Sequence, residues 1–201
     1  MTVLFDESTH TYTVDGAVVP SVTQLCAPLG QDYDEPTDLM ESVLDFATDR
    51  GVTLHAYIAH RLMGGSREDF EVPDIYAPWQ DAVELFLAEH TIVPLLIETP
   101  LGGDGFAGTP DLVCEIDGEF AIVDYKFVSQ IAKTKVGAQL HGYKVLCAIN
   151  GIFPEKLYAV QFLSSGDYRL YPIGLAGEID FTLCRRLYEA KHRRHSRGRI
   201  D

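Results

Sequence analysis

Two kinds of hydrophobic periodicity alternate along this chain. Runs rich in Val, Thr and aromatic residues, with apolar and polar side chains in turn, predict β-strands, whereas apolar residues three or four positions apart predict amphipathic helices. Strand-like runs flank the turn Asp15-Gly16 within residues 3–20 and return at residues 92–101, 106–116, 120–127, 157–163 and 168–173. Helical spacing covers residues 36–62, 74–90, 133–150 and 177–195. This order predicts one α/β domain on a mixed sheet, preceded by a hairpin.

Short turns connect three of the predicted strands. The stretch Gly102-Gly-Asp-Gly105 follows the run 92–101, and Asp117-Gly118 separates the next two runs. Tight turns of this kind join antiparallel neighbours, so we expect a three-stranded meander. The sequence has no internal repeat and no low-complexity linker.

The charge of the chain is acidic overall but uneven. Its 201 residues include 16 Lys+Arg and 30 Asp+Glu, a formal net charge of −14, which on average disfavours the phosphate backbone of nucleic acids. However, no acidic residue lies between Asp124 and Glu155, and residues 185–201 carry seven basic and two acidic side chains. That basic segment is either a solvated tail or an arm that follows phosphates. The acidic total therefore does not exclude DNA as a partner.

The composition places the protein among ordinary globular proteins, since 46% of its residues are hydrophobic. No apolar run approaches the roughly 18 residues of a membrane span, and the N-terminus lacks the layout of a signal peptide. We therefore expect a cytoplasmic protein with no membrane association. The four cysteines lie far apart, which predicts buried free thiols rather than a metal cluster: Cys26, Cys114, Cys147 and Cys184.

The candidate chemistry lies in the strand-like run 120–127. Side chains alternate between the two faces of a strand, so Asp124 and Lys126 share one face while their apolar neighbours share the other. An acid and a lysine are costly to bury there unless a metal ion or a substrate phosphate neutralises them. The neighbouring strand-like run, 106–116, carries Asp111, and two such carboxylates repel each other unless a cation lies between them. Oxygen ligands of this kind suit Mg²⁺ or Mn²⁺.

Each of these fragments also has an ordinary structural explanation. An Asp-x-Lys triplet is usually an exposed strand edge with a surface ion pair, and Asp111 follows Pro110 as a turn residue often does. A single histidine such as His55 on a largely apolar helix is usually a packing residue. Their combination in one meander favours a site.

The same residues carry a resemblance to a known family. Pro110-Asp111 followed by Asp124-Tyr125-Lys126 resembles the signature of the PD-(D/E)XK nucleases. Further motifs resemble those of the RecB-like exonuclease branch in its phage-type form. With them, the resemblance extends from the first strand to about Tyr143. They are Arg50-Gly-x-x-x-His55, Gly108-x-x-Asp111, Gln139-x-x-x-Tyr143, and an opening hairpin with His10-Thr-Tyr12 and Val19-Pro-Ser-Val-Thr23.

The resemblance implies a fold and a division of the chain. The fold is a restriction-endonuclease-like core in which helices flank a mixed β-sheet in the order αβββαβ, with an N-terminal β-hairpin. Residues 1–201 then form a single nuclease domain, in which residues 1–35 are the hairpin extension and residues 185–201 the basic C-terminal tail.

The resemblance also implies roles for individual residues. His55, Asp111 and Asp124 would ligate the divalent metal together with the backbone carbonyl of Tyr125, and Glu98 is a weaker candidate for a second metal. Lys126 would be the catalytic lysine, which positions the attacking water or stabilises charge on the phosphate. A further group would bind or position DNA: Arg50, Lys135, Gln139 and Tyr143.

These roles predict a Mg²⁺-dependent (or Mn²⁺-dependent) DNA nuclease. The expected enzyme is an exonuclease on linear duplex or single-stranded DNA in phage or bacterial recombination or repair, working with a recombinase, an annealing protein or a helicase. No iron–sulfur cluster is expected, because Cys26 has no clustered cysteines after it. The alternatives are a structure- or site-specific endonuclease with the same core, an inactive module that binds nucleic acid or protein, and an unrelated α/β domain.

Overall fold

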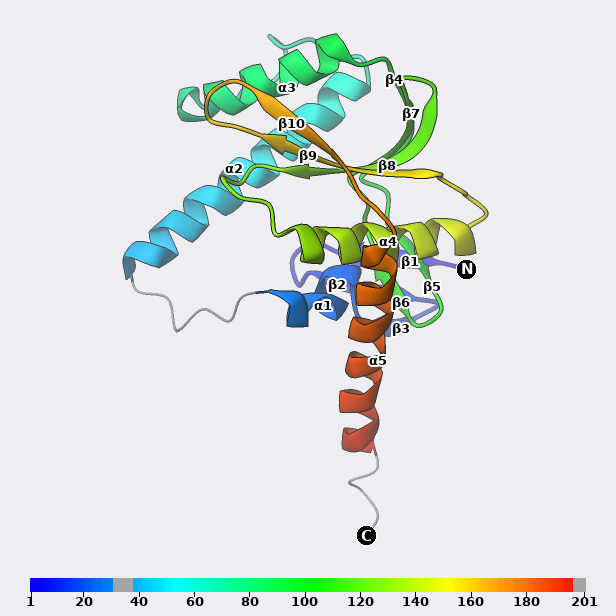
Figure 1. Ribbon diagram of the computed structural model, residues 1–201. Helices are drawn as coiled ribbons and strands as arrows, with labels where there is room; N and C mark the ends of the chain where they lie inside the picture. Colours follow the sequence, from blue (N-terminus) through cyan, green and yellow to red (C-terminus); the bar gives the residue numbers. More distant parts are fainter. Residues whose placement is uncertain (31–37, 197–201) are drawn as a thin grey trace.

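A five-stranded mixed sheet forms the centre of the computed structural model, which describes residues 1–30 and 38–196 (Figure 1). The strand order is β10-β9-β8-β7-β4, with antiparallel pairing except between β8 and β9, which are parallel. The strands are β4 (Ile92–Ile97), β7 (Leu112–Ile116), β8 (Glu119–Lys126), β9 (Lys156–Phe162) and β10 (Tyr168–Pro172). The antiparallel series β4-β7-β8 confirms the expected meander.

Helices cover both faces of this sheet (Figure 1). α2 (Asp38–Leu62) and α3 (Ala77–Glu89, after a 3-10 turn at Asp74–Tyr76) lie on one face. α4 (Lys133–Ile149) lies on the other and connects the parallel strands β8 and β9, as a crossover between parallel strands requires. α5 (Ala176–Ser196) packs against α4 and projects away from the sheet. The order α3-β4-β7-β8-α4-β9 confirms the expected αβββαβ core flanked by helices.

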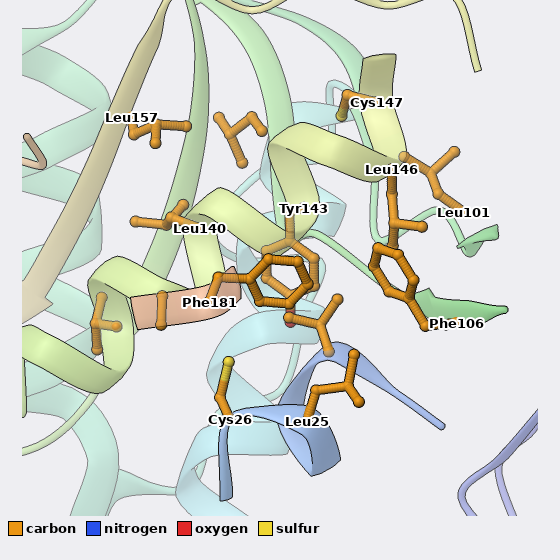
Figure 2. Packing of buried hydrophobic residues seen from close by; sticks show 14 of the residues in the cluster. Leu25, Cys26, Leu101, Phe106, Leu140, Tyr143, Leu146, Cys147, Leu157 and Phe181 are labelled. Carbon is orange, nitrogen blue, oxygen red and sulfur yellow. The ribbon is translucent and has the colours of Figure 1, made fainter. Parts of the chain in front are cut away.

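Strand β8 separates two hydrophobic clusters. Val123, Tyr125 and Phe127 belong to the cluster under α2 and α3, whereas Ile122 belongs to the cluster with α4 and α5. Figure 2 shows the second cluster, in which Tyr143 of α4 and Phe181 of α5 lie among its labelled members. The same alternation places Asp124 and Lys126 together on the face of β8 that Ile122 shares, the α4 side; that the two residues share a face is as the sequence predicts.

The N-terminal hairpin is confirmed. β1 (Val3–Asp6), β2 (Thr11–Val14) and β3 (Ala17–Val19) form an antiparallel sheet, and the turn residues Asp15 and Gly16 have φ of 48° and 83°. A short helix α1 (Val22–Leu25) and a 3-10 turn (Ala27–Leu29) follow, with Ser21 and Gln24 forming a capping box. The rest of the predicted extension, residues 31–35, lies outside the described residues.

The predicted single strand 106–116 is wrong. β5 (Leu101–Gly103) and β6 (Phe106–Gly108) pair with each other in a separate sheet, and β7 begins only at Leu112. Gly102 and Gly103, predicted as part of a turn, lie in β5, and Asp104 and Gly105 connect the two strands. Pro110 cannot donate a ladder hydrogen bond, so the segment between β6 and β7 leaves the sheet. Asp111 therefore lies where the chain returns to it.

The basic segment is helical from residue 185 to residue 196, because α5 continues to Ser196. Arg185 forms ion pairs with Asp104 (2.7 Å) and Glu189 (3.2 Å), which neutralise part of its charge locally. Residues 197–201 lie outside the described part of the chain. None of the helices in the described ranges combines the length and hydrophobicity that a membrane span needs.

Candidate active site

Three elements bring His55, Glu98 and Asp111 together. His55 projects from the middle of α2, Glu98 follows β4, and Asp111 precedes β7. Nδ1 of His55 lies 3.4 Å from Oε1 of Glu98 and 3.7 Å from Oδ1 of Asp111. The imidazole ring also lies edge-on to the rings of Tyr125 (5.8 Å) and Phe127 (5.5 Å). These contacts hold the ring with one nitrogen directed at the carboxylates.

Asp111 is fixed from two sides. Its Oδ2 accepts a hydrogen bond from the backbone N–H of Tyr125 at 2.6 Å, and its backbone carbonyl accepts one from the N–H of Glu98 at 3.0 Å. The first bond joins Asp111 directly to the residue after Asp124. The structure therefore confirms that the two aspartates lie at neighbouring points of the meander, as their positions in the sequence suggest.

Asp124, which is buried, and Lys126, which is partly exposed, form an ion pair. Nζ of Lys126 lies 2.6 Å from Oδ2 of Asp124, whose side chain is only 2% exposed. Apart from this contact, Oδ2 has no hydrogen-bond partner among the described residues. Burial raises the pKa of Asp124 to about 6, while the nearby lysine opposes the rise. Burial lowers the pKa of Lys126, but the charges of Asp124 and Asp111 raise it more, so the lysine stays cationic.

The acidic side chains beside His55 raise the pKa of its imidazole. Burial lowers the pKa of His55, but Asp111 and Glu98 outweigh that effect, and the pKa lies above its usual value. The site as a whole thus favours positive charge, whether on the imidazole, on Lys126 or on a bound cation.

The donor set fits a hard divalent cation. Carboxylate oxygens and an imidazole nitrogen are ligands for Mg²⁺ or Mn²⁺, and the buried oxygen of Asp124 has only one cationic neighbour to satisfy it. Within residues 1–30 and 38–196, no group of three His, Cys, Asp or Glu side chains already has a metal-holding arrangement. Instead, His55 pairs with Glu98 and Asp111, and Asp124 pairs with Lys126, so a cation would replace these ion pairs.

A cleft of about 740 Å³ opens beside these residues. His55, Glu98 and Asp111 form one side of it. The N-terminal hairpin also lines it, through residues that include Phe5 and Tyr12. His55, Glu98 and Asp111 are thus accessible from a space of the size that binds small molecules, about 300–1,000 Å³, whereas Asp124 and Lys126 do not line it.

Two residues of the predicted DNA-positioning group lie on one face of α4, away from the cleft lining. Gln139 donates a hydrogen bond from Nε2 to Oγ1 of Thr23 at 3.0 Å. Tyr143 is buried in the α4–α5 cluster and lies beside Gly108 (Figure 2). Lys135, on the same helix, lies near Gly30. Contact between these residues and DNA stays a prediction.

Arg50 is buried rather than presented to solvent. Its guanidinium lies 4.4 Å from the centre of the Trp79 ring and 5.4 Å from that of Phe46, and it donates a hydrogen bond to the backbone carbonyl of Phe127. Arg50 therefore ties α2 to the end of β8, directly after Lys126. Through these contacts it supports the strand that carries the ion pair.

Gln161 is a supporting residue that the sequence does not single out. It is 2% exposed and lies opposite Lys126 in the parallel ladder. Its Nε2 donates to the carbonyls of Val128 (2.8 Å) and Ser129 (3.0 Å), and its Oε1 accepts from the hydroxyl of Tyr171 (3.1 Å). The sequence signal that could have identified Gln161 is its place as a single glutamine within the apolar run of β9, because a buried amide needs hydrogen-bond partners.

No protein-family model and no curated protein matches this sequence. Among solved structures, the chain is similar to the crystal structure of an alkaline exonuclease (LHK-Exo) from Laribacter hongkongensis. That match has a TM-score of 0.40 and 12% identity, and covers 88% of this chain and 91% of that one. The same exonuclease in complex with dAMP gives a TM-score of 0.40 and 12% identity over 89% and 92%. At this level of similarity, an activity for this chain must rest on its own residues.

Proposed function

We propose that this protein is a metal-dependent deoxyribonuclease that hydrolyses phosphodiester bonds. The observation that carries the proposal is the ion pair between the buried Asp124 and Lys126, next to Asp111 and His55, which line an open cleft. A buried carboxylate with one cationic partner is costly for stability alone, which favours a role in binding or chemistry.

Mg²⁺ or Mn²⁺ would be held by His55, Asp111, Asp124 and the backbone carbonyl of Tyr125, with Glu98 as a candidate for a second ion. Once bound, the cation would act as a Lewis acid that stabilises negative charge on the scissile phosphate. The hydrogen bond from the Tyr125 N–H fixes one carboxylate oxygen of Asp111, which would leave the other oxygen for such an ion.

Lys126 would orient the attacking water or stabilise charge on the phosphate. Its ammonium is held by Asp124 and has a raised pKa, so it is protonated at neutral pH. A cationic donor at this point orients a water for attack on phosphorus or stabilises the charge that develops on the phosphate oxygens. Arg50 and Gln161 hold the backbone that follows Lys126, so they are positioning residues in this proposal.

The favoured substrate is linear DNA, and the favoured reaction is exonucleolytic. Gln139, Tyr143 and Lys135 would position DNA or the lysine from α4. The cellular role would be recombination or repair in the cytoplasm of a bacterium or of a phage-infected cell. A recombinase, an annealing protein or a helicase would supply or use the processed strand.

The test uses end-labelled linear single- and double-stranded DNA and closed circles, with and without Mg²⁺ or Mn²⁺. Metal-dependent loss of linear DNA alone supports the exonuclease, whereas cutting of circles supports an endonuclease of the same fold. Asp124→Ala is expected to abolish cleavage, and Glu115→Ala, which removes an exposed carboxylate of β7, to preserve it. Wild-type protein that cuts nothing with either metal, or an active Asp124→Ala variant, would refute the proposal.

A further inference from the structure

The lining of the cleft beside the candidate active site includes an aromatic wall as well as acidic residues. Phe5 of β1 and Tyr12 of β2 are register partners, and their rings stack with centroids 4.4 Å apart and planes 29° apart. The ring of His10 lies edge-on to Phe5 at 6.0 Å. All three residues line the cleft.

This wall is tied to the active-site residues by a direct contact. The hydroxyl of Tyr12 lies 2.8 Å from Oγ1 of Thr109, two residues before Asp111. Tyr12 is 8% exposed and serves as the inner support, while Phe5 is half-buried and has ring surface left to bind a ligand. A flat group that stacks on Phe5 would therefore lie in the same cleft as His55 and Asp111.

The charges in the cleft indicate how a nucleic acid would be held there. Of the described residues that line it, none is Lys or Arg, and the hairpin contributes the acidic Glu7. Backbone phosphates would find no permanent cation in this lining apart from a bound metal. Aromatic rings stack on the faces of nucleobases without regard to sequence, and this stacking does not require a basic side chain.

We propose that the β1–β2 wall, with Phe5 at its centre, is a nucleobase-stacking subsite that takes an unpaired base of a DNA strand. The inference rests on the proposed nuclease function and specifies its substrate. Away from the ends of a duplex, both faces of each base are covered by its neighbours, so an internal base must be unstacked to lie on Phe5. The enzyme should therefore act on single strands or on frayed strand ends in preference to intact duplex.

The binding test compares wild type with Phe5→Ala, Phe5→Trp and, as matched control, Val18→Ala, which removes an exposed apolar side chain of β3 outside the cleft lining. The probe is a short single-stranded oligonucleotide that contains 2-aminopurine, a base whose fluorescence falls when it stacks, with Ca²⁺ in place of Mg²⁺. Phe5→Ala should bind about 5- to 100-fold more weakly and lose the quenching. Phe5→Trp should retain both, and Val18→Ala should match wild type.

A second arm uses oligonucleotides with one abasic site at successive positions. Wild type should lose affinity by the same factor when the stacked base is missing, whereas Phe5→Ala should not distinguish the intact from the abasic strand. With Mg²⁺, the Phe5→Ala change should appear mainly in KM rather than in kcat. A fold defect in Phe5→Ala would instead lower thermal stability and would not remove the abasic discrimination.

The outcomes separate this inference from the proposed function. If wild type cleaves DNA but Phe5→Ala binds single strands equally well and still detects the abasic site, the stacking subsite is refuted and the nuclease stands. If wild type cleaves nothing, the nuclease is refuted, and quenching that depends on Phe5 still decides whether the wall binds bases.

Discussion

The contact between α4 and α5 gives a prediction whose sign can be read from the backbone. A Cβ added at Gly177 would lie 2.5 Å from both the carbonyl carbon and the carbonyl oxygen of Gly137, and 2.8 Å from Cδ2 of His141. Backbone atoms cannot rotate away, so Gly177→Ala must push the two helices apart. Overpacking of this kind costs about 1–3 kcal/mol of unfolding free energy.

Gly137→Ala is the matched control, because it lies on the same interface. A Cβ there would meet the nearest atoms, in Gly177 and Ile173, at 3.6 and 3.7 Å, which is ordinary van der Waals contact. Replacing glycine by alanine within a helix contributes up to about 1 kcal/mol, so this variant should be neutral or more stable. Urea unfolding followed by circular dichroism measures both changes. Equal effects, or a stable Gly177→Ala variant, would refute the close packing of α4 on α5.

Two further predictions concern residues outside the catalytic group. Gln161→Leu removes three hydrogen bonds of a buried amide and should lower the unfolding free energy by about 2–4 kcal/mol, while Gln130→Leu on the exposed loop should change it little. Burial raises the pKa of Glu84, but hydrogen bonds from Arg61 at 2.7 and 2.9 Å help lower it below its usual value. A lowered pKa stabilises the fold above the unfolded value of about 4.3, and this contribution is lost as pH falls through the folded pKa. Glu84→Gln should therefore flatten the acid side of the Tm–pH profile, and Glu68→Gln should leave it unchanged.

Local patterns in the sequence were sufficient for most of the architecture. The alternation in residues 120–127 places Asp124 and Lys126 on one face of β8, and the Asp-Gly pairs mark turns. The predicted helix 133–150 differs from α4 by one residue, because helix spacing and the Asn150-Gly151 stop are local signals. Asp111 beside the following strand also follows from the meander, since neighbouring strands lie about 5 Å apart.

What the sequence did not predict depends on contacts between distant segments. Pro110 marks a break between Phe106 and Ile116, but the local pattern does not show that β5 and β6 pair with each other in a separate sheet. The burial of Arg50 between two aromatic rings depends on how α2 meets the end of β8. The same holds for the aromatic wall, because tertiary packing brings the hairpin and His55 to the same cleft.

Asp124 and Lys126 are the two residues on which the proposed metal-dependent hydrolysis depends. The most direct measurement compares Mn²⁺ binding with hydrolysis of linear DNA in Asp124→Asn, Lys126→Met and the control Lys156→Met, an exposed lysine that pairs with Glu119 at 3.3 Å. Asp124→Asn should lose both properties, Lys126→Met should bind Mn²⁺ but hydrolyse DNA about 100-fold or more slowly, and Lys156→Met should match wild type. Hydrolysis by Asp124→Asn at the wild-type rate, or wild-type protein that binds no Mn²⁺, would contradict this proposal.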